Sequence, residues 1–261
     1  MDIIKVLSEE LKVQKWQVEA AVKLIDEGNT IPFISRYRKE ATGALNDEVL
    51  RNLHERLVYL RGLEERKATV LASIEEQGKL TDELKVKIEA AQTMVAVEDL
   101  YRPYKPKRKT RASVAKEKGL EPLANIIYLQ MTKKPLEEEA AAYIDEEKGV
   151  ATAEEAIAGA KDILAESISD EADYRTKIRK LTENDGTVVS EAKDEETQSV
   201  YEMYYHFAES VKKIAGHRIL ALNRGEAEKV LSVKIEAPVD KIIAYLEQEV
   251  IKQNNPITTP V

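Results

Sequence analysis

Cysteine is absent from this chain of 261 residues, which excludes disulfide bonds, thiolate metal sites and thiol catalysis. A chain without thiols is compatible with a reducing compartment, and we expect a cytoplasmic protein. Long apolar runs are absent as well, since no segment approaches the ~20 apolar residues of a membrane-spanning helix. The first residues, MDIIKVLSEELKVQKWQVEAA, carry charges too often for a signal peptide. The sequence therefore predicts no membrane contact.

The motifs of common nucleotide and hydrolase sites are also missing. The ten glycines form no P-loop, no dinucleotide fingerprint and no nucleophile elbow. The segment HERLV begins like a zinc-binding helix at His54, but Val58 stands where the second histidine is needed. His206 and His217 would be ~16 Å apart on the helix that we expect there, too far to share a metal ion. We expect a protein that is not an enzyme, with no catalytic residue, metal site or cofactor.

Aromatic residues make up only 5% of the chain and charged residues 34%, and apolar residues recur at spacings of three and four. This pattern is typical of amphipathic helices, so we expect a mainly α-helical fold, an array of helical hairpins. In the first half, helices are expected at residues 3–11, 16–25, 30–40, 46–78 and 81–95, the last with an inward stripe of Leu84, Ile88, Ala91 and Val95. Asn46 and Thr81 are expected N-caps, Gly28 and Gly78 expected ends. Trp16 is expected to anchor one helix to another.

The second half combines helices with a small β element. Helices are expected from Thr152 to Ile168, from about Glu195 to Asn223, and from Pro238 to Val250. In the middle one, the residues expected to point inward are Val200, Met203, Phe207, Val211 and Ile214. A β-branched run near residues 187–190 and an alternating run at 229–236 predict two strands. Since two strands alone make no stable sheet, we expect a longer protein whose other part completes or covers it.

Charge is sorted into blocks along the chain. The formal net charge is −8, so the molecule as a whole would not be attracted to nucleic acid. Between Arg102 and Lys118, however, there are eight Lys and Arg and a single Glu, whereas residues 137–173 contain thirteen Asp and Glu. Any binding of a polyanion must therefore be local. The acidic runs favour a solvated helical surface.

The basic segment, defined here as residues 101–111, combines dense positive charge with prolines that favour an extended backbone and with two tyrosines. Its cations could neutralise phosphates, and its aromatic rings could stack on unpaired bases. The candidate nucleic-acid-binding residues are Tyr101, Arg102, Tyr104, Lys105, Lys107, Arg108, Lys109 and Arg111. An alternative is that these cations pair with the acidic helices of residues 137–173 and close the domain.

A second candidate is the segment FISRYRK. It places Arg36, Arg38 and Lys39 around Tyr37 at the end of a short helix. Surface salt bridges explain this cluster equally well.

Three long segments carry a family resemblance: residues 31–84, IPFISRYRKEATGALNDEVLRNLHERLVYLRGLEERKATVLASIEEQGKLTDEL; residues 98–124, EDLYRPYKPKRKTRASVAKEKGLEPLA; and HRILALNRGE from His217. Together they resemble the bacterial Tex family of transcription accessory proteins. The resemblance implies a helical N-terminal region with a helix-turn-helix-like segment. That region would precede an RNase H-like domain, a helix-hairpin-helix region and a C-terminal OB-fold domain. We accordingly divide the chain at 1–78, 79–185 and 186–261, the last ending before the RNase H-like domain.

Two hypotheses follow for function. The first is a non-enzymatic N-terminal segment of a transcription accessory protein that contributes to binding of RNA or DNA through the basic segment. The alternative is a helical interaction scaffold that docks to the transcription machinery without touching nucleic acid. The resemblance implies RNA polymerase or ribosome-associated proteins, together with the remaining domains of the full-length chain, as protein partners.

Overall fold

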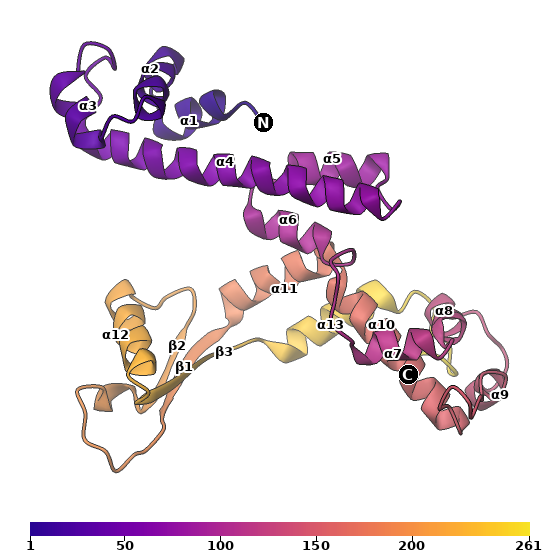
Figure 1. Cartoon of the computed structure of the whole chain (residues 1–261). Helices are drawn as coiled ribbons and strands as arrows, with labels where there is room; N and C mark the ends of the chain where they lie inside the picture. Colours follow the sequence, from indigo (N-terminus) through magenta and orange to yellow (C-terminus); the bar gives the residue numbers. More distant parts are fainter. The chain divides into compact units, whose positions relative to one another are not determined.

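The structure, a computed structural model, describes residues 1–261. They form two compact units, Met1–Tyr104 and Lys105–Val261 (Figure 1). The expected boundary at residue 78 lies inside the first unit, between two helices that share a core. The fold is mainly α, as predicted, with thirteen α-helices and one three-stranded sheet. No helix is both long and apolar enough to cross a bilayer.

Three short helices of the first unit, α1 (Ile3–Leu11), α2 (Lys15–Asp26) and α3 (Ile31–Tyr37), pack on the N-terminal half of α4 (Asp47–Glu76). These helices confirm the predicted elements. The Asn46 side chain caps α4 by accepting a hydrogen bond from the Val49 amide at 2.8 Å. The core between them consists of apolar side chains at helical spacing: Leu7, Val18, Ala21, Val22, Ile34, Leu45, Leu50, Leu53, Leu57 and Leu60. Trp16 is 52% exposed, so the prediction that it anchors two helices is wrong.

The C-terminal half of α4 packs against α5 (Asp82–Ala90) and α6 (Met94–Tyr101). Thr81 caps α5 as predicted. The prediction of one continuous stripe to Val95 is wrong, because Thr93 caps a new helix by accepting a hydrogen bond from the Ala96 amide. Because a new helix begins after Thr93, Val97 points into the core and Val95 is left 48% exposed.

In the second unit, α10 (Ala153–Asp170) is the central helix. It packs against α7 (Arg111–Glu117), α8 (Glu121–Leu129) and α9 (Leu136–Ala141), and α11 (Ala172–Asp185) follows it. The Thr152 side chain caps α10 as predicted, accepting from the Glu155 amide at 3.2 Å. Gly159 permits a close approach, since a Cβ atom there would lie 2.3 Å from Cδ1 of Leu120.

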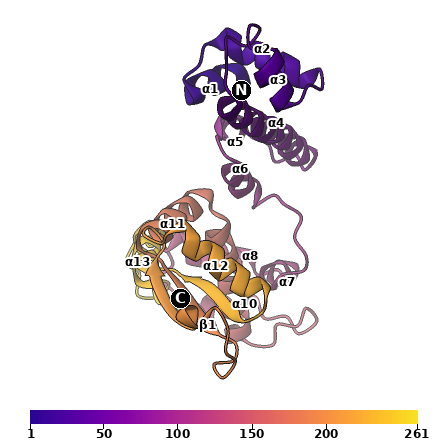
Figure 2. The ribbon, with the colours of Figure 1, turned by 90° about the vertical axis from the view of Figure 1, so that its left-hand side faces the viewer.

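The sheet consists of β1 (Thr187–Ala192), β2 (His206–Ser210) and β3 (Leu231–Glu236) in the antiparallel order β2-β1-β3. The predicted helix from Glu195 to Asn223 is therefore wrong. Its residues form a loop, a single 3-10 turn (Glu202–Tyr204), β2 and the start of α12 (Gly216–Ala227), which lies alongside β3 (Figure 2).

The aromatic side chains explain this correction. Val200 and Met203, both expected inside, are 86% and 75% exposed. Tyr201, Tyr204 and Tyr205 are buried instead, in a core shared with Leu222 and Leu231. Since β2 supplies a third strand, the expectation that this sheet needs a missing segment loses its basis.

The last helix, α13 (Val239–Val250), follows Pro238 as predicted. The chain beyond it is tied to the end of α8 by the side chains of Gln130 and Asn255. The Gln130 amide donates to the Val250 carbonyl at 2.7 Å, and its oxygen accepts from the amides of Lys252 and Gln253, each at 2.9 Å. Ile257 and Val261 then pack against the core around α10.

Candidate nucleic-acid interface

The basic segment starts at the last residue of α6, crosses a loop and ends at the first residue of α7. The loop prediction is thus confirmed. Thr110 ends the loop as the N-cap of α7: its hydroxyl accepts from the Ser113 amide at 3.0 Å, and its own amide donates to the Ser113 hydroxyl at 2.8 Å. The division between the two units falls inside the segment, after Tyr104.

The tyrosines of the segment are part of the first unit's core. Tyr101 is only 7% exposed; its hydroxyl lies 3.0 Å from the Ser73 hydroxyl, and the Arg66 guanidinium lies 5.4 Å from its ring centre. The prediction that Tyr101 stacks on a base is therefore wrong. Tyr104 is half-buried against the same core, and its carbonyl accepts from the Gln77 amide group at 3.0 Å.

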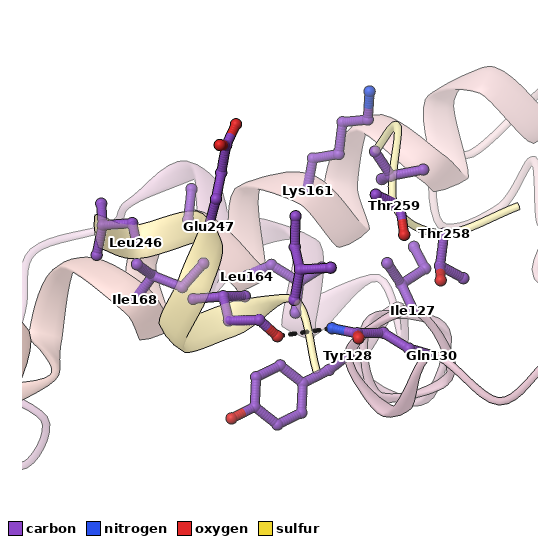
Figure 3. A pocket seen from close by; sticks show the side chains of 14 residues that line it. Ile127, Tyr128, Gln130, Lys161, Leu164, Ile168, Leu246, Glu247, Thr258 and Thr259 are labelled. Atoms are coloured by element: carbon purple, nitrogen blue, oxygen red, sulfur yellow. Dashed lines mark hydrogen bonds between the residues drawn. The ribbon is translucent and has the colours of Figure 1, made fainter. Parts of the chain in front are cut away.

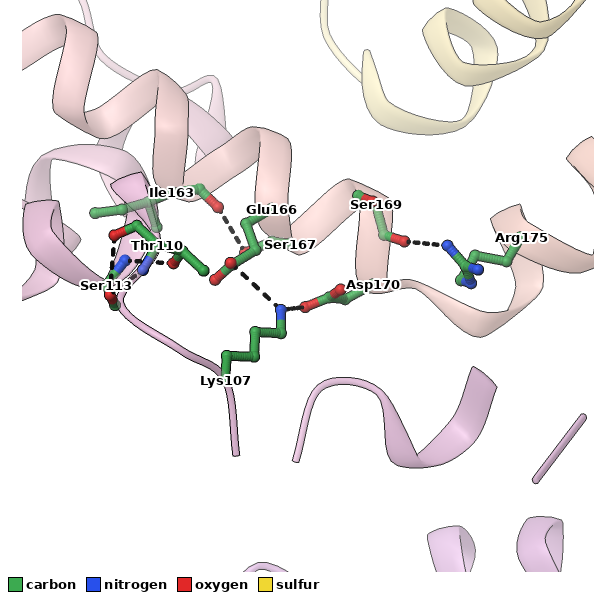
Figure 4. A network of polar contacts seen from close by, with 9 residues as sticks. All are labelled: Lys107, Thr110, Ser113, Ile163, Glu166, Ser167, Ser169, Asp170 and Arg175. Atoms are coloured by element: carbon green, nitrogen blue, oxygen red, sulfur yellow. Dashed lines mark hydrogen bonds and ion pairs between the residues drawn. The ribbon is translucent and has the colours of Figure 1, made fainter. Parts of the chain in front are cut away.

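Lys107 turns inward and takes part in a network with the C-terminal end of α10 (Figure 4). Its ammonium pairs with Asp170, and it lies 3.4 Å from Oε1 of Glu166. Asp170 is 7% exposed. For Lys107 the alternative is confirmed, because this cation neutralises carboxylates of the acidic block instead of meeting an outside ligand.

The cations after Lys107 are held much more loosely. Arg108 is exposed and forms no ion pair. Lys109 lies 3.8 Å from Glu117 and Arg111 lies 3.4 Å from Asp162, while their side chains remain 71% and 88% exposed. Ion pairs this exposed contribute about 0–1 kcal/mol. These three cations therefore remain accessible to an anion.

The other two predicted cations are accounted for within the chain. Arg102 and Lys105 are exposed, but each has an interaction partner within the protein. The wider block behaves similarly: Lys116 pairs with Glu121 at 3.2 Å, and Lys118 donates to the Gly149 carbonyl at 2.7 Å. Dense positive charge in the sequence thus becomes a mixture of internal pairs and accessible cations.

The second candidate cluster, Arg36 to Lys39, lies at the C-terminal end of α3. All four side chains are exposed, Tyr37 by 62%. None of Arg36, Arg38 and Lys39 forms an ion pair. The arginines lie over aromatic rings instead: Arg36 is 5.9 Å from the centre of Tyr37, and Arg38 is 5.5 Å from the centre of Phe33. The alternative of surface salt bridges is therefore wrong here.

The three histidines and the carboxylates do not gather at one point of the structure that could hold a metal ion. No three His, Cys, Asp or Glu side chains lie close enough to hold a metal ion. His54 is exposed on α4; His206 lies on β2, 3.4 Å from a Glu195 oxygen; His217 lies on α12. The expectation that the last two share one helix is wrong.

An apolar pocket of about 360 Å³ lies in the second unit between α8, α10, α13 and the C-terminal residues (Figure 3). Its walls include Ile127, Leu164 and Ile168, while the charged ends of Lys161 and Glu247 point away from these walls.

Sequence reasoning missed the partners that decide which cations are accessible. Asp170 and Glu166 lie about sixty residues from Lys107 in the chain, so no local pattern pairs them. It also missed the residues that support the second cluster, Gln17 and Thr42. For Thr42 a signal existed, since the following Gly43 marks a tight turn.

Comparison with known proteins agrees with this architecture. The family description "Tex-like protein N-terminal domain" matches residues 1–75, and "Tex central region-like" matches residues 130–257. The basic segment lies between the two matches, and the cluster from Arg36 to Lys39 lies within the first.

Individual relatives match across nearly the whole chain. The uncharacterized protein YdcI of Bacillus subtilis is 49% identical over 252 residues, 95% of this chain and 35% of that protein. The transcriptional accessory protein Tex of Neisseria gonorrhoeae is 46% identical over 245 residues, 92% of this chain and 32% of that protein. The human S1 RNA-binding domain-containing protein 1 is 32% identical over 244 residues, 90% of this chain and 24% of that protein.

The chain spans about a third of the length of these bacterial relatives. Within that span, one family match lies in each structural unit, and the matched order of N-terminal and central regions is that of the chain. The chain therefore belongs to the Tex family of transcription accessory proteins and carries its N-terminal and central regions.

Proposed function

We propose that this chain is a non-enzymatic, helical part of a transcription accessory protein that contacts the phosphate backbone of nucleic acid through Arg108, Lys109 and Arg111. The names of its relatives support a role in transcription: one is called a transcriptional accessory protein and another an S1 RNA-binding domain-containing protein. The proposal narrows the predicted set of eight residues to the three whose cationic groups are accessible.

The observation that carries the proposal is the difference in ion pairing between Lys107 and the three cations that follow it within residues 107–111. Lys107 is fixed against a buried carboxylate, whereas the three cations that follow are exposed and have either no partner or a loose one. An exposed carboxylate contact is worth about 0–1 kcal/mol, so a phosphate replaces it at little cost. Each phosphate neutralised by a cation also releases condensed counterions. Lys107 thus positions the backbone from which the other three reach outward.

A second candidate function is a docking scaffold for the transcription machinery, without nucleic-acid contact. The Lys107 network favours it, because that network shows positive charge in the segment serving the fold. Under this reading, the loosely held cations would meet an acidic protein surface, such as one on RNA polymerase or a ribosome-associated protein.

The test measures binding of the whole chain to single- and double-stranded nucleic acid at several salt concentrations. Changing Arg108, Lys109 and Arg111 to Ala should flatten the slope of log K against log salt by roughly two to three units. A matched control removes three exposed lysines that form no ion pair: Lys133, Lys134 and Lys180. The control should leave the slope nearly unchanged. An unchanged slope in the first variant, with its fold intact, would favour the scaffold.

A further inference from the structure

The turn after α3 is held in one conformation by buried polar contacts. The Thr42 hydroxyl, in a fully buried residue, bonds to the carbonyls of Arg38 at 3.2 Å and Lys39 at 3.4 Å. The Ala44 amide donates to the Lys39 carbonyl at 2.7 Å. From α2, the Gln17 amide donates to the carbonyls of Thr42 at 3.3 Å and Gly43 at 3.0 Å. The backbone that carries the cationic cluster is therefore fixed before any ligand arrives.

Gly43 and Trp16 complete this support. Gly43 has φ +60°, in the left-handed region, and a Cβ atom there would lie 2.4 Å from Cη2 of Trp16. Only glycine satisfies both conditions without displacing the indole ring. Trp16 thus lies against the turn on one side, while about half of this large side chain remains exposed.

The cations on this fixed turn differ from the arginines elsewhere in the same unit. Each arginine of α4 pairs with a carboxylate: Arg51 with Asp47, Arg56 with Glu10, Arg61 with Asp26 and Arg66 with Glu98. Arg36 and Arg38 do not, although Glu40 is close in sequence. Together with Tyr37, Lys39, Glu40 and Ala41 they line a hollow of about 340 Å³, in which three cations outnumber one carboxylate. Three unpaired cations therefore lie next to one another within four residues of this unit.

We propose that the cluster of Arg36, Tyr37, Arg38 and Lys39 binds single-stranded nucleic acid. The three cations contact consecutive phosphates, and an unpaired base stacks on the exposed ring of Tyr37. This site lies in the first unit and does not depend on the contact proposed for Arg108, Lys109 and Arg111.

The aromatic ring selects this ligand over its competitors. In a duplex the bases already stack on one another, so an exposed tyrosine beside the phosphate contacts would gain nothing. An acidic peptide would use the cations but has no need of the ring. A single strand uses both, because every base offers a flat face and every nucleotide a phosphate.

The chain contains a built-in reporter for this site, since Trp16 is its single tryptophan and lies against Gly43. We expect oligothymidylate or oligouridylate to change the Trp16 fluorescence of the whole chain. The variant in which Arg108, Lys109 and Arg111 are Ala should retain that change, even if its total affinity falls. Loss of the change in that variant, with its fold intact, would overturn the independent site and leave the basic segment as the sole contact.

Variants at Tyr37 separate stacking from charge. Tyr37→Ala should weaken binding of oligothymidylate roughly 5- to 150-fold, the range for losing one base stacked on an aromatic ring. Tyr37→Phe keeps the ring and should bind like the parent. Changing Arg36, Arg38 and Lys39 to Ala should flatten the salt slope by roughly two units. Because all four side chains are exposed, the thermal unfolding of these variants should match the parent and verify folding.

Three further results would overturn the proposal. The first is equal affinity of Tyr37→Ala and the parent for single strands. The second is binding of duplex DNA at the fluorescent site as tightly as single strands of matched length. The third is equally tight binding of polyglutamate, which would show a site for acidic protein instead.

Discussion

The two cationic regions of this chain share cations and tyrosines in their sequences but differ in structure. The basic segment has more cations, six against three, yet Lys107 is neutralised by the acidic end of α10 and Tyr101 is buried. The cluster from Arg36 to Lys39 has fewer cations, but none of them forms an ion pair and its tyrosine is exposed. Accessible charge is therefore set by carboxylates distant in the chain, and density in the sequence is a poor measure of it.

The largest expected change in stability is at Gly43, in the turn that carries the second cluster. Gly43→Ala should lower the free energy of unfolding by about 2–3 kcal/mol, since a left-handed Ala costs about 1–2 kcal/mol and the displaced Trp16 ring adds about 1 kcal/mol. Gly28→Ala is the matched control, because Gly28 has φ +84° but nothing within 4 Å of its Cβ position. Urea unfolding of both variants measures the difference. Equal losses would show that Trp16 does not press on Gly43.

A smaller loss is expected from Lys107, the cation that serves the fold. Lys107→Met should cost about 1–2 kcal/mol, because it removes a partner of the buried Asp170 carboxylate. Lys109→Met removes the same charge two residues further along the chain, where Lys109 forms only an exposed pair with Glu117. This change should alter stability by less than about 0.5 kcal/mol. Chemical denaturation of both variants provides the measurement. If Lys109 proved as costly as Lys107, the distinction between fixed and accessible cations would collapse.

The two tyrosines provide a third contrast. Tyr101→Phe removes the hydroxyl that lies beside Ser73 and should lower stability by about 1 kcal/mol without altering nucleic-acid affinity. Tyr37→Phe should alter neither stability nor affinity, because the Tyr37 ring is exposed and its hydroxyl has no described partner. Thermal unfolding and fluorescence titration distinguish these outcomes. Weaker nucleic-acid binding by Tyr101→Phe would show that Tyr101 contributes to the interface after all.

The smallest effect concerns pH. Hydrogen bonds from Arg56 lower the pKa of Glu10, and hydrogen bonds from Arg61 lower the pKa of Asp26. A carboxylate whose pKa is lower in the folded state contributes stability above its unfolded pKa. That contribution disappears as the pH falls through the folded pKa.

Changing both arginines to Met should therefore destabilise the chain slightly at neutral pH. The gap between parent and variant should narrow as the pH falls below the ordinary carboxyl pKa values of about 4, and it should close only below the lowered pKa values of the folded parent. Urea unfolding at several pH values measures the gap. A gap that persisted under acid would assign the loss to packing of the arginine side chains.

Local signals in the sequence predicted α1 to α5, α10 and α13, because caps and apolar stripes act within a few residues. Asn46, Thr81 and Thr152 cap the helices that they were expected to start. The prediction failed between residues 195 and 223, where apolar residues at helical spacing coincide with buried aromatic residues of a β strand and its loop. No local rule shows that the Tyr204 and Phe207 rings lie 5.3 Å apart in a core closed by Leu231.

For the candidate site, the sequence identified the correct residue types but not their accessibility. The cations and tyrosines could be chosen from density and spacing alone. Whether a cation faces water depends on pairs such as Lys107 with Asp170, which only the folded chain brings together. The same holds for the turn at Gly43, whose rigidity derives from Trp16 and Gln17 on a different helix.

The tie between Gln130 and residues 250–253 has a consequence for biosynthesis. A nascent chain emerges from its N-terminus, so the helices around α10 are synthesised long before the backbone groups that Gln130 binds and before Ile257, which packs on their core. The first unit closes through contacts within its own hundred or so residues and can mature early. In the second unit, the apolar surface around α10 stays partly uncovered until residues 250–261 have been synthesised. We expect the unit to be most prone to misassembly, and most open to chaperones, during that interval.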